Sequence, residues 1–308
     1  MPKSENCLLC NADPSFLAAI PVEVYEGRGQ HKVYHCNKCD VRFLYPGLND
    51  RDEAKFYAKE FEKFMSVRSA VDAGWEKPEE HIRANQLQVE RRMEYLKGLL
   101  PTKGRVLEVG CSSGFLLYPI MEKNIECVGV EPSGVFSEYV RKRGIHCYDS
   151  VESMCESGAA DSKFDIVMHY FVLEHIRKAE AFLSIQMEML KPGGYLVLEV
   201  PHALDALHSL FKISAYNKFI WVVSHRWYFS TASLEFLLRK VAPESDINVS
   251  QDQRYDLSNH LIWARDGKPG GMAHFTSVLG VEVENAYRKS LIQAGYGDTL
   301  IAIIQKPV

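Results

Sequence analysis

Short apolar runs alternate with amphipathic stretches through the middle of the chain. The apolar runs lie at 106–109, 127–130, 145–148, 164–168, 190–201 and 299–305, and the more polar stretch 246–255 is a further predicted strand. Between the first two, residues 115–123 have the apolar spacing of a helix. Continuous apolar runs joined by helices are typical of parallel strands covered on both faces. We therefore predict an α/β fold with a mostly parallel, doubly wound sheet and an antiparallel last strand.

The segments before this sheet predict smaller elements. Alternating apolar positions over 20–24 and 33–34 predict a β-hairpin, and the following run VRFLYP predicts a return strand. A helix is expected through EAKFYAKEFEKFM, with Asn49 or Asp50 as its cap. A second, long amphipathic helix is expected from His81 to Leu100, with Leu87 on its apolar face.

These patterns divide the chain into three parts. Residues 1–48 form a small module, residues 49–100 a helical bridge and residues 101–308 the main domain. Two insertions interrupt the main domain, an apolar and aromatic one at about 203–230 and one at about 256–275. We interpret the first as a helical lid over a substrate cavity, and the second as a loop that joins it.

Composition narrows the classes of protein to consider. The 308 residues carry a formal net charge of −4, so there is no basic excess of the kind that marks nucleic-acid binding. No apolar run reaches the roughly 20 residues that span a bilayer. The N-terminus lacks a signal-peptide layout. We expect a cytoplasmic protein without a nucleic-acid or membrane partner, and its oligomeric state stays open.

Four of the eight cysteines form two C-x2-C pairs. They are Cys7, Cys10, Cys36 and Cys39. Two such pairs supply the four thiolates of a tetrahedral zinc site, whereas a redox dithiol would need only one pair. We predict a structural zinc in a zinc-ribbon module. Four thiolates leave no coordination position open for chemistry, so a docking or lid role beside the main domain is expected.

The stretch RVLEVGCSSGFLLYPIMEKNIECVGVEP, residues 105–132, predicts strand, glycine turn, helix and strand. A dinucleotide fingerprint that begins at Gly110 would need glycine where Ser112 and Phe115 stand, so no close approach to a pyrophosphate is provided. The pattern E-x-G-x-x-x-G that remains, Glu108 to Gly114, resembles motif I of the class I S-adenosylmethionine (SAM) methyltransferases. Two later runs, FDIVMHYFVLEHI and LKPGGYLVLEVP, resemble further motifs of the same family.

The resemblance implies a Rossmann-like sheet and a set of residues that bind SAM. Glu131 matches the acid that binds the ribose hydroxyls, which suits a carboxylate acceptor. Asp149 follows the third strand, where the family places an acceptor for the adenine amine; it fits a loop or helix-capping acid equally well. His169 is expected at the edge of the SAM pocket. The full predicted cofactor set is Glu108, Gly110, Cys111, Ser112, Gly114, Glu131, Pro132, Asp149 and His169.

The acceptor half of the site is predicted from the second half of the chain. The run H-x-x-Y-F-S at 225–230 resembles a segment of sugar methyltransferases, notably zinc-containing enzymes that act on nucleotide-linked deoxysugars, in which this histidine lies at the active site. His225 is therefore the candidate general base, with a histidine that only hydrogen-bonds the lid as the alternative. Weaker catalytic candidates are His202 and Tyr228. Candidate substrate contacts are Arg226, Tyr57 and His260.

Three functions fit these patterns. The first is SAM-dependent methyl transfer to a small molecule, such as a sugar, a nucleotide-sugar or a natural-product intermediate. The second is a nucleic-acid or protein methyltransferase that docks through its zinc ribbon. The third is a Rossmann-like binding module that has lost transfer chemistry. The acceptor atom, whether oxygen, nitrogen or carbon, is not indicated by the sequence.

Overall fold

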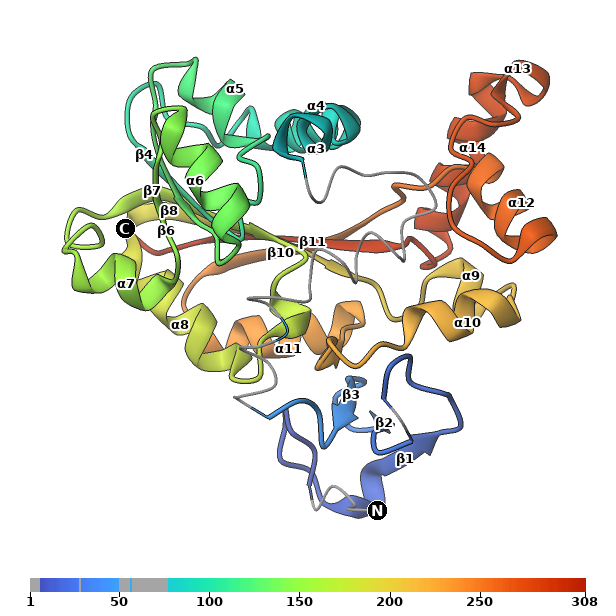
Figure 1. Cartoon of the computed structure of the whole chain (residues 1–308). Helices are drawn as coiled ribbons and strands as arrows, with labels where there is room; N and C mark the ends of the chain where they lie inside the picture. The colour runs from blue at the N-terminus through green and yellow to red at the C-terminus, as the bar shows by residue number, and fades with distance from the viewer. Residues whose placement is uncertain (1–5, 28, 50–55, 57–76) are drawn as a thin grey trace.

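The computed structural model describes residues 6–27, 29–49, 56 and 77–308, and its main domain is built on a seven-stranded sheet (Figure 1). The strands are β4 (Arg105–Val109), β5 (Glu126–Val130), β6 (His146–Tyr148), β7 (Phe164–Tyr170), β8 (Leu190–Pro201), β10 (Asp246–Asp252) and β11 (Thr299–Gln305). Their order in the sheet is β10-β11-β8-β7-β4-β5-β6. Strand β11 runs antiparallel to both of its neighbours, and the pairs from β8 to β6 are parallel. The predicted α/β sheet with an antiparallel last strand is confirmed.

Helices cover both faces of this sheet (Figure 1). One face carries α3 (Pro78–Ala84), α4 (Gln86–Leu96), α5 (Leu117–Met121) and α6 (Gly134–Lys142), and the other α7 (Val151–Glu156), α8 (Ala179–Met189) and α11 (Thr231–Val241). Side chains alternate along each strand, so β4 buries Val106 against the first group and Leu107 with the second. Both faces are apolar for this reason, and the strands read as continuous hydrophobic runs.

The N-terminal module has its own four-stranded antiparallel sheet, in the order β1-β2-β3-β9. The predicted hairpin is β1 (Leu17–Ile20) with β2 (Lys32–Cys36), and the predicted return strand is β3 (Arg42–Tyr45). The fourth strand, β9 (Trp227–Tyr228), comes from the far end of the chain. The module is therefore completed by a strand of the main domain, which the pattern of residues 1–48 did not predict.

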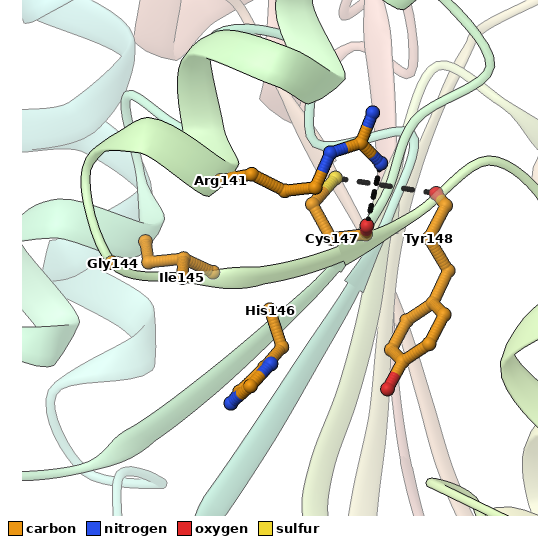
Figure 2. A pocket seen from close by; sticks show the side chains of 6 residues that line it. All are labelled: Arg141, Gly144, Ile145, His146, Cys147 and Tyr148. Carbon is orange, nitrogen blue, oxygen red and sulfur yellow. Dashed lines mark hydrogen bonds between the residues drawn. The ribbon is translucent and has the colours of Figure 1, made fainter. Parts of the chain in front are cut away.

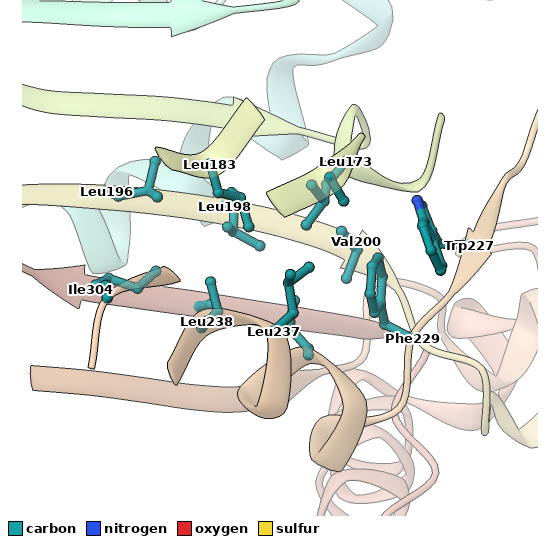
Figure 3. Close-up of a cluster of buried hydrophobic side chains, with 14 of the residues drawn as sticks. Leu173, Leu183, Leu196, Leu198, Val200, Trp227, Phe229, Leu237, Leu238 and Ile304 are labelled. Atoms are coloured by element: carbon teal, nitrogen blue, oxygen red, sulfur yellow. The ribbon is translucent and has the colours of Figure 1, made fainter. Parts of the chain in front are cut away.

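A single hydrophobic core runs from the large sheet into the module. Figure 3 shows Leu196, Leu198 and Val200 of β8 facing Leu237 of α11, with Trp227 and Phe229 at one end of the cluster. The same cluster continues into the module through buried residues of its strands and knuckles. These are Cys7, Leu9, Tyr34, Cys36, Cys39, Val41 and Phe43. The two parts share apolar burial, the main stabilising force in folding.

The predicted long helix at 81–100 is in fact two helices, α3 and α4, that meet at Asn85. The Asn85 side chain donates to the carbonyl of His81, a competing bond that favours a break. Leu87 is 62% exposed, so its predicted place on the apolar face is wrong. Of the preceding predicted helix the structure describes only Phe56, which is helical and buried; Asp50, one of the two predicted caps, and Tyr57 lie outside the described residues.

The lid insertions form helices that pack on one another. The first contains α9 (Ala206–Ser209) and α10 (Ser214–Ile220). The second, predicted to be a loop, is helix α12 (Leu257–Asp266), because Asp256 accepts the amide of Asn259 as an N-cap. Trp263 of α12 lies with its ring centroid 5.1 Å from those of Tyr216 and Phe219 on α10. Two further helices, α13 (Thr276–Leu279) and α14 (Val281–Gln293), precede β11. Among the described helices none is long and apolar enough to cross a bilayer.

Candidate active site

The glycine turn after β4 has a left-handed backbone at three positions. Gly110, Ser112 and Gly114 have φ of 75°, 45° and 72°. Glycine populates this region without steric cost. A Cβ at Gly110 would lie 2.7 Å from the Cγ2 of Val172, so a side chain there would collide as well as strain the backbone. The amides of Gly110 and Cys111 both donate to the carbonyl of Val130, which holds the turn against the end of β5.

Glu131 lies directly after β5 and ties the turn to helix α6. One carboxylate oxygen accepts the amide of Ser112 at 2.7 Å, and the other accepts the amide of Ser133 at 2.8 Å. Ser133 stands at the N-cap of α6, where its side chain forms no cap bond and its amide donates to Glu131. The carboxylate is thus held at the carboxyl end of the sheet, where doubly wound folds bind nucleosides. Its contact with a ribose stays a prediction.

Helix α3 packs on the glycine turn through His81, a residue that belongs to none of the sequence motifs. His81 Nδ1 lies 2.9 Å from Ser113 Oγ, and the His81 ring packs at 5.7 Å from Phe115 and 5.1 Å from Phe136. Burial lowers the pKa of His81 to about 4, so the ring is neutral at physiological pH. The sequence offered no signal for this contact, because a single histidine on a helix has no distinguishing spacing.

A row of polar side chains crosses the α4 face of the sheet where the strands end. Tyr170 lies with its ring 3.9 Å from the Arg92 guanidinium, and Glu199 bonds both Arg91 (2.8 Å) and Arg92 (3.2 Å). Glu108 is also fully buried, and burial raises its pKa to about 8 despite the nearby Arg92. Its Oε2 has no hydrogen-bond partner among the described residues. A sulfonium near this carboxyl would favour its ionised form.

Replacing Glu199 with glutamine is expected to lower the free energy of unfolding at pH 7 by about 3–5 kcal/mol, because it strands the buried charges of Arg91 and Arg92. Burial opposes ionisation of Glu199, but Arg92 and Arg91 outweigh it and hold its pKa at about 2, below the ordinary 4.5. This stabilisation is therefore full above pH 4.5 and is lost as the pH falls toward 2. Urea denaturation of wild type and variant at pH 7, 5 and 4 measures the difference.

The matched control is Glu235→Gln, which removes an exposed carboxylate paired with Arg239 on α11. Its effect should stay within about 0.5 kcal/mol. A Glu199→Gln variant as stable as this control, or a stability gap that widens below pH 4.5, would contradict the assignment.

The remaining predicted cofactor residues take different positions. Cys111 points away from the turn surface, with its Sγ 3.9 Å from that of Cys147, so only its backbone faces the turn. His169 is fully buried and packs edge-on against Phe182 of α8, and its place at the edge of a SAM pocket stays a prediction. Pro132 is exposed beside Glu131.

Asp149 is exposed after β6 and is bonded by Arg141 at 3.1 Å. Figure 2 shows the pocket beside it, with Arg141 donating to the carbonyl of Cys147. This pocket has a volume of about 360 Å³ and is lined by residues 144–148 and Arg141. It lies along the edge strand β6 and contains none of the predicted cofactor residues, so we assign it no role. The contact of Asp149 with adenine stays a prediction.

The candidate base His225 lies against two polar residues that follow β7. The His175 and His225 rings meet edge to face at 4.8 Å, and one ligand-type atom from each of Glu174, His175 and His225 lies within 4.8 Å of the others. His175 Nδ1 is 2.9 Å from the carbonyl of Ser224 and must donate to it, so Nε2 carries the lone pair in the neutral ring. Glu174 is fully buried, and burial raises its pKa to about 8. Glu174 is therefore mostly neutral at pH 7.

The other predicted acceptor residues are bound to protein groups. The Tyr228 hydroxyl contacts the amide of Val222 at 3.0 Å and its carbonyl at 3.3 Å, and its catalytic role stays a prediction. Arg226 donates to two carbonyls of the N-terminal module, and its contact with a substrate stays a prediction. His202 is buried and bonds the carbonyl of Gly297. His260 lies between α12 and α14, 2.7 Å from the Tyr287 hydroxyl.

The four N-terminal cysteines converge as predicted. Cys7 and Cys39 have their Sγ atoms 3.7 Å apart, and so do Cys10 and Cys36; all four lie within 4.8 Å of one another. All four are free thiols. A tetrahedral site with metal–sulfur bonds of about 2.3 Å has sulfur–sulfur edges of about 3.8 Å. The cluster therefore fits a tetrahedral zinc ion.

Comparison with known proteins gives three findings. A family model described as a methyltransferase domain matches residues 80–241. The ubiquinone biosynthesis O-methyltransferase of Rhizobium etli is 28% identical over 131 residues, and that of Rhizobium rhizogenes is 31% identical over 134; each match covers 41% of this chain and 53% of the relative. The chain thus spans about half the length of the curated relatives it matches.

Among solved structures, the plantazolicin methyltransferase BpumL in complex with SAH aligns with a TM-score of 0.50 at 13% identity. The alignment covers 84% of this chain and 95% of that chain. At this identity the likeness concerns the fold alone.

Proposed function

The chain belongs to the methyltransferase family whose model matches more than half of its residues, and from this premise we propose that it transfers a methyl group from SAM to a small-molecule acceptor. The observation that carries the proposal is the pair of sites at one edge of the sheet. The turn at 110–114 with Glu131 forms the first, and His225 with Glu174 and His175 forms the second. Both follow the carboxyl ends of parallel strands, β4 and β5 for the first and β7 for the second.

The residues of the first site fit SAM better than a dinucleotide. SAM supplies an electrophilic methyl group on a positively charged sulfur and carries no phosphate. Ser112 and Phe115 replace the glycines that a pyrophosphate would need, and two buried carboxyl groups, Glu108 and Glu131, stand at the strand ends. A ribose diol offers two donors to the Glu131 carboxylate.

Methyl transfer needs an in-line approach of the acceptor and, for a hydroxyl or amine, removal of a proton. Positioning two reactants supplies much of the rate in such reactions. In the proposed mechanism His225 takes the acceptor proton as the methyl group arrives. Glu174 is mostly neutral at pH 7, so it adds little negative charge beside the imidazolium that His225 becomes. His175 is fixed by Ser224 and limits the movement of the His225 ring.

Two observations bear on the class of acceptor, and each favours a different class. The run at 225–230 resembles sugar methyltransferases, which favours a sugar, nucleotide-sugar or natural-product intermediate. The names of the curated relatives favour a second candidate, O-methylation of a hydroxylated aromatic ring. His225 suits both, because each acceptor must lose a proton.

The test is transfer of a labelled methyl group from SAM to a panel of acceptors. The panel contains nucleotide-linked deoxysugars, dihydroxybenzenes, and nucleic acid and protein as macromolecular controls. Transfer to a small molecule supports the proposal, and the class that accepts the label decides between the two candidates. Transfer confined to nucleic acid, with binding that weakens steeply as salt rises, would overturn it.

We also propose that the four cysteines hold one structural zinc ion. Purified protein should contain about one zinc per chain by mass spectrometry. Cys36→Ser should lose the metal and lower the melting temperature, because binding free energy at such sites, about 10–16 kcal/mol, is folding free energy. The control Cys155→Ser changes an exposed thiol outside the cluster, and it should keep both the zinc ion and the wild-type melting temperature. Full stability of the metal-free variant would contradict a structural role.

A further inference from the structure

The segment 221–230 carries the candidate base and is held on one side by the N-terminal module. Tyr25 accepts the amide of Val223 at 3.1 Å and donates to the carbonyl of Trp221 at 2.8 Å. Strand β9 within this segment pairs with β3, with Phe43 opposite Trp227. Ser230 Oγ donates to the carbonyl of Asp40 at 3.3 Å. The module therefore contacts this segment on both sides of His225.

The other side of the same segment is bonded to the residues after β7. The amide of Arg226 donates to the carbonyl of Glu174 at 2.7 Å. Trp227 Nε1 donates to the carbonyl of Ile176 at 2.7 Å, and Ser224 accepts from His175. His225 thus lies in a segment fixed between the module and the turn that supplies Glu174 and His175.

Arg226 is the residue that joins these two sets of contacts. Its Nη1 donates to the carbonyls of Leu44 at 2.7 Å and Pro46 at 3.0 Å, and its own carbonyl accepts the amide of Leu44 at 3.0 Å. Gly47 lies under the guanidinium: a Cβ at Gly47 would overlap Nη1 and lie 3.3 Å from Cζ. The cavity left between these groups is only about 10 Å³, roughly the space of one water. The contact is tightly packed.

Apolar burial supports the same junction. Val24, Val33 and Leu44 of the module form one buried cluster with Trp221 and Tyr228, and Trp221 is fully buried. Interiors packed at this density transmit small displacements instead of absorbing them. A shift of the module should therefore move residues 221–230, and a shift of about 1 Å at a catalytic group costs on the order of a hundredfold in rate.

We propose that the four-cysteine module is part of the catalytic site, because it holds His225 in place through strand pair β3–β9 and the Arg226 contact over Gly47. In this proposal Arg226 acts as a positioning residue for His225. This inference rests on the proposed role of His225 as the base. It predicts that disturbing the junction slows methyl transfer and leaves SAM binding intact, because the glycine turn and Glu131 are held by bonds to the end of β5 and the start of α6.

The sharpest test compares two alanine substitutions in the module. Gly47 and Gly29 have nearly equal left-handed backbones, with φ of 65° and 69°, so alanine strains both alike. A Cβ at Gly29 meets nothing within 4 Å, whereas one at Gly47 displaces the Arg226 guanidinium. Gly47→Ala should lower kcat by about tenfold or more relative to Gly29→Ala and shift the acid limb of the pH–rate profile, with the Kd for SAM within twofold. Amide hydrogen exchange over 221–230 should rise in Gly47→Ala alone.

Arg226→Ala provides a second route to the same result, with exposed Arg239→Ala on α11 as its control. Equal kcat and equal exchange in the two glycine variants would overturn the inference. So would faster exchange without loss of kcat, or loss of kcat without faster exchange. Failure of the proposed function is seen separately: His225→Ala would then retain wild-type turnover, whatever the glycine variants do.

Discussion

Replacing Glu131 with alanine is expected to abolish measurable SAM binding in isothermal titration calorimetry. The variant loses the acceptor proposed for the two ribose hydroxyls. It also loses the bonds from the amides of Ser112 and Ser133, which hold the glycine turn next to helix α6. Hydrogen bonds to a charged group contribute about 1.5–3 kcal/mol each. Two such bonds to the ribose correspond to a loss of about a hundredfold to ten-thousandfold in affinity, before any loosening of the turn is counted.

The control for this experiment is Glu126→Ala on the same strand. Glu126 is an exposed carboxylate that bonds Arg105, at the opposite end of β5 from the glycine turn. The Glu126→Ala substitution should leave SAM affinity unchanged. Micromolar SAM affinity in Glu131→Ala would show that the carboxylate only closes the turn, and the assignment of the cofactor site would fall.

Replacing His225 with alanine is expected to lower kcat by roughly two orders of magnitude or more, with SAM affinity retained. General base catalysis contributes about 10²- to 10⁴-fold, and the other imidazole of the same cluster is that of His175. His175 cannot take over simply, because its Nδ1 is held by Ser224. Single-turnover rates at saturating SAM, measured from pH 6 to 9, separate the chemical step from binding.

His146→Ala is a suitable control, because it removes an exposed histidine on edge strand β6, away from the 221–230 segment. It should keep both turnover and affinity. If His225→Ala turns over like this control, His225 serves only to pack the segment against His175 and Tyr228.

Strands and short-range motifs were predictable because their signals are local. Val106, Leu107 and Val109 form an apolar run whatever lies elsewhere in the chain, and Glu131 is recognised by its distance from Gly110. The spacing of the two C-x2-C pairs is enough by itself to predict a shared metal site.

The long-range contacts around the glycine turn and the strand ends were not predictable, because each joins residues far apart in sequence. Arg91 and Arg92 meet Glu199 across more than a hundred residues, and His81 meets Ser113 across 32. One signal was present: Glu199 is a charged residue inside the apolar run 190–201, and a buried charge requires a partner. The sequence could show that such a partner exists, but not that it is an arginine pair on α4.

Strand β9 has a consequence for the order in which the protein is made. The module's cysteines and strands β1 to β3 are synthesised first, but the strand that completes their sheet ends at Tyr228, about 180 residues after Tyr45. At roughly 5–20 residues per second, the ribosome needs about 10–40 s to deliver it. During that interval the β3 edge that later pairs with β9 lacks this partner, the kind of surface on which chains associate wrongly. The nascent chain therefore depends on its first 48 residues staying unaggregated until the histidine segment emerges.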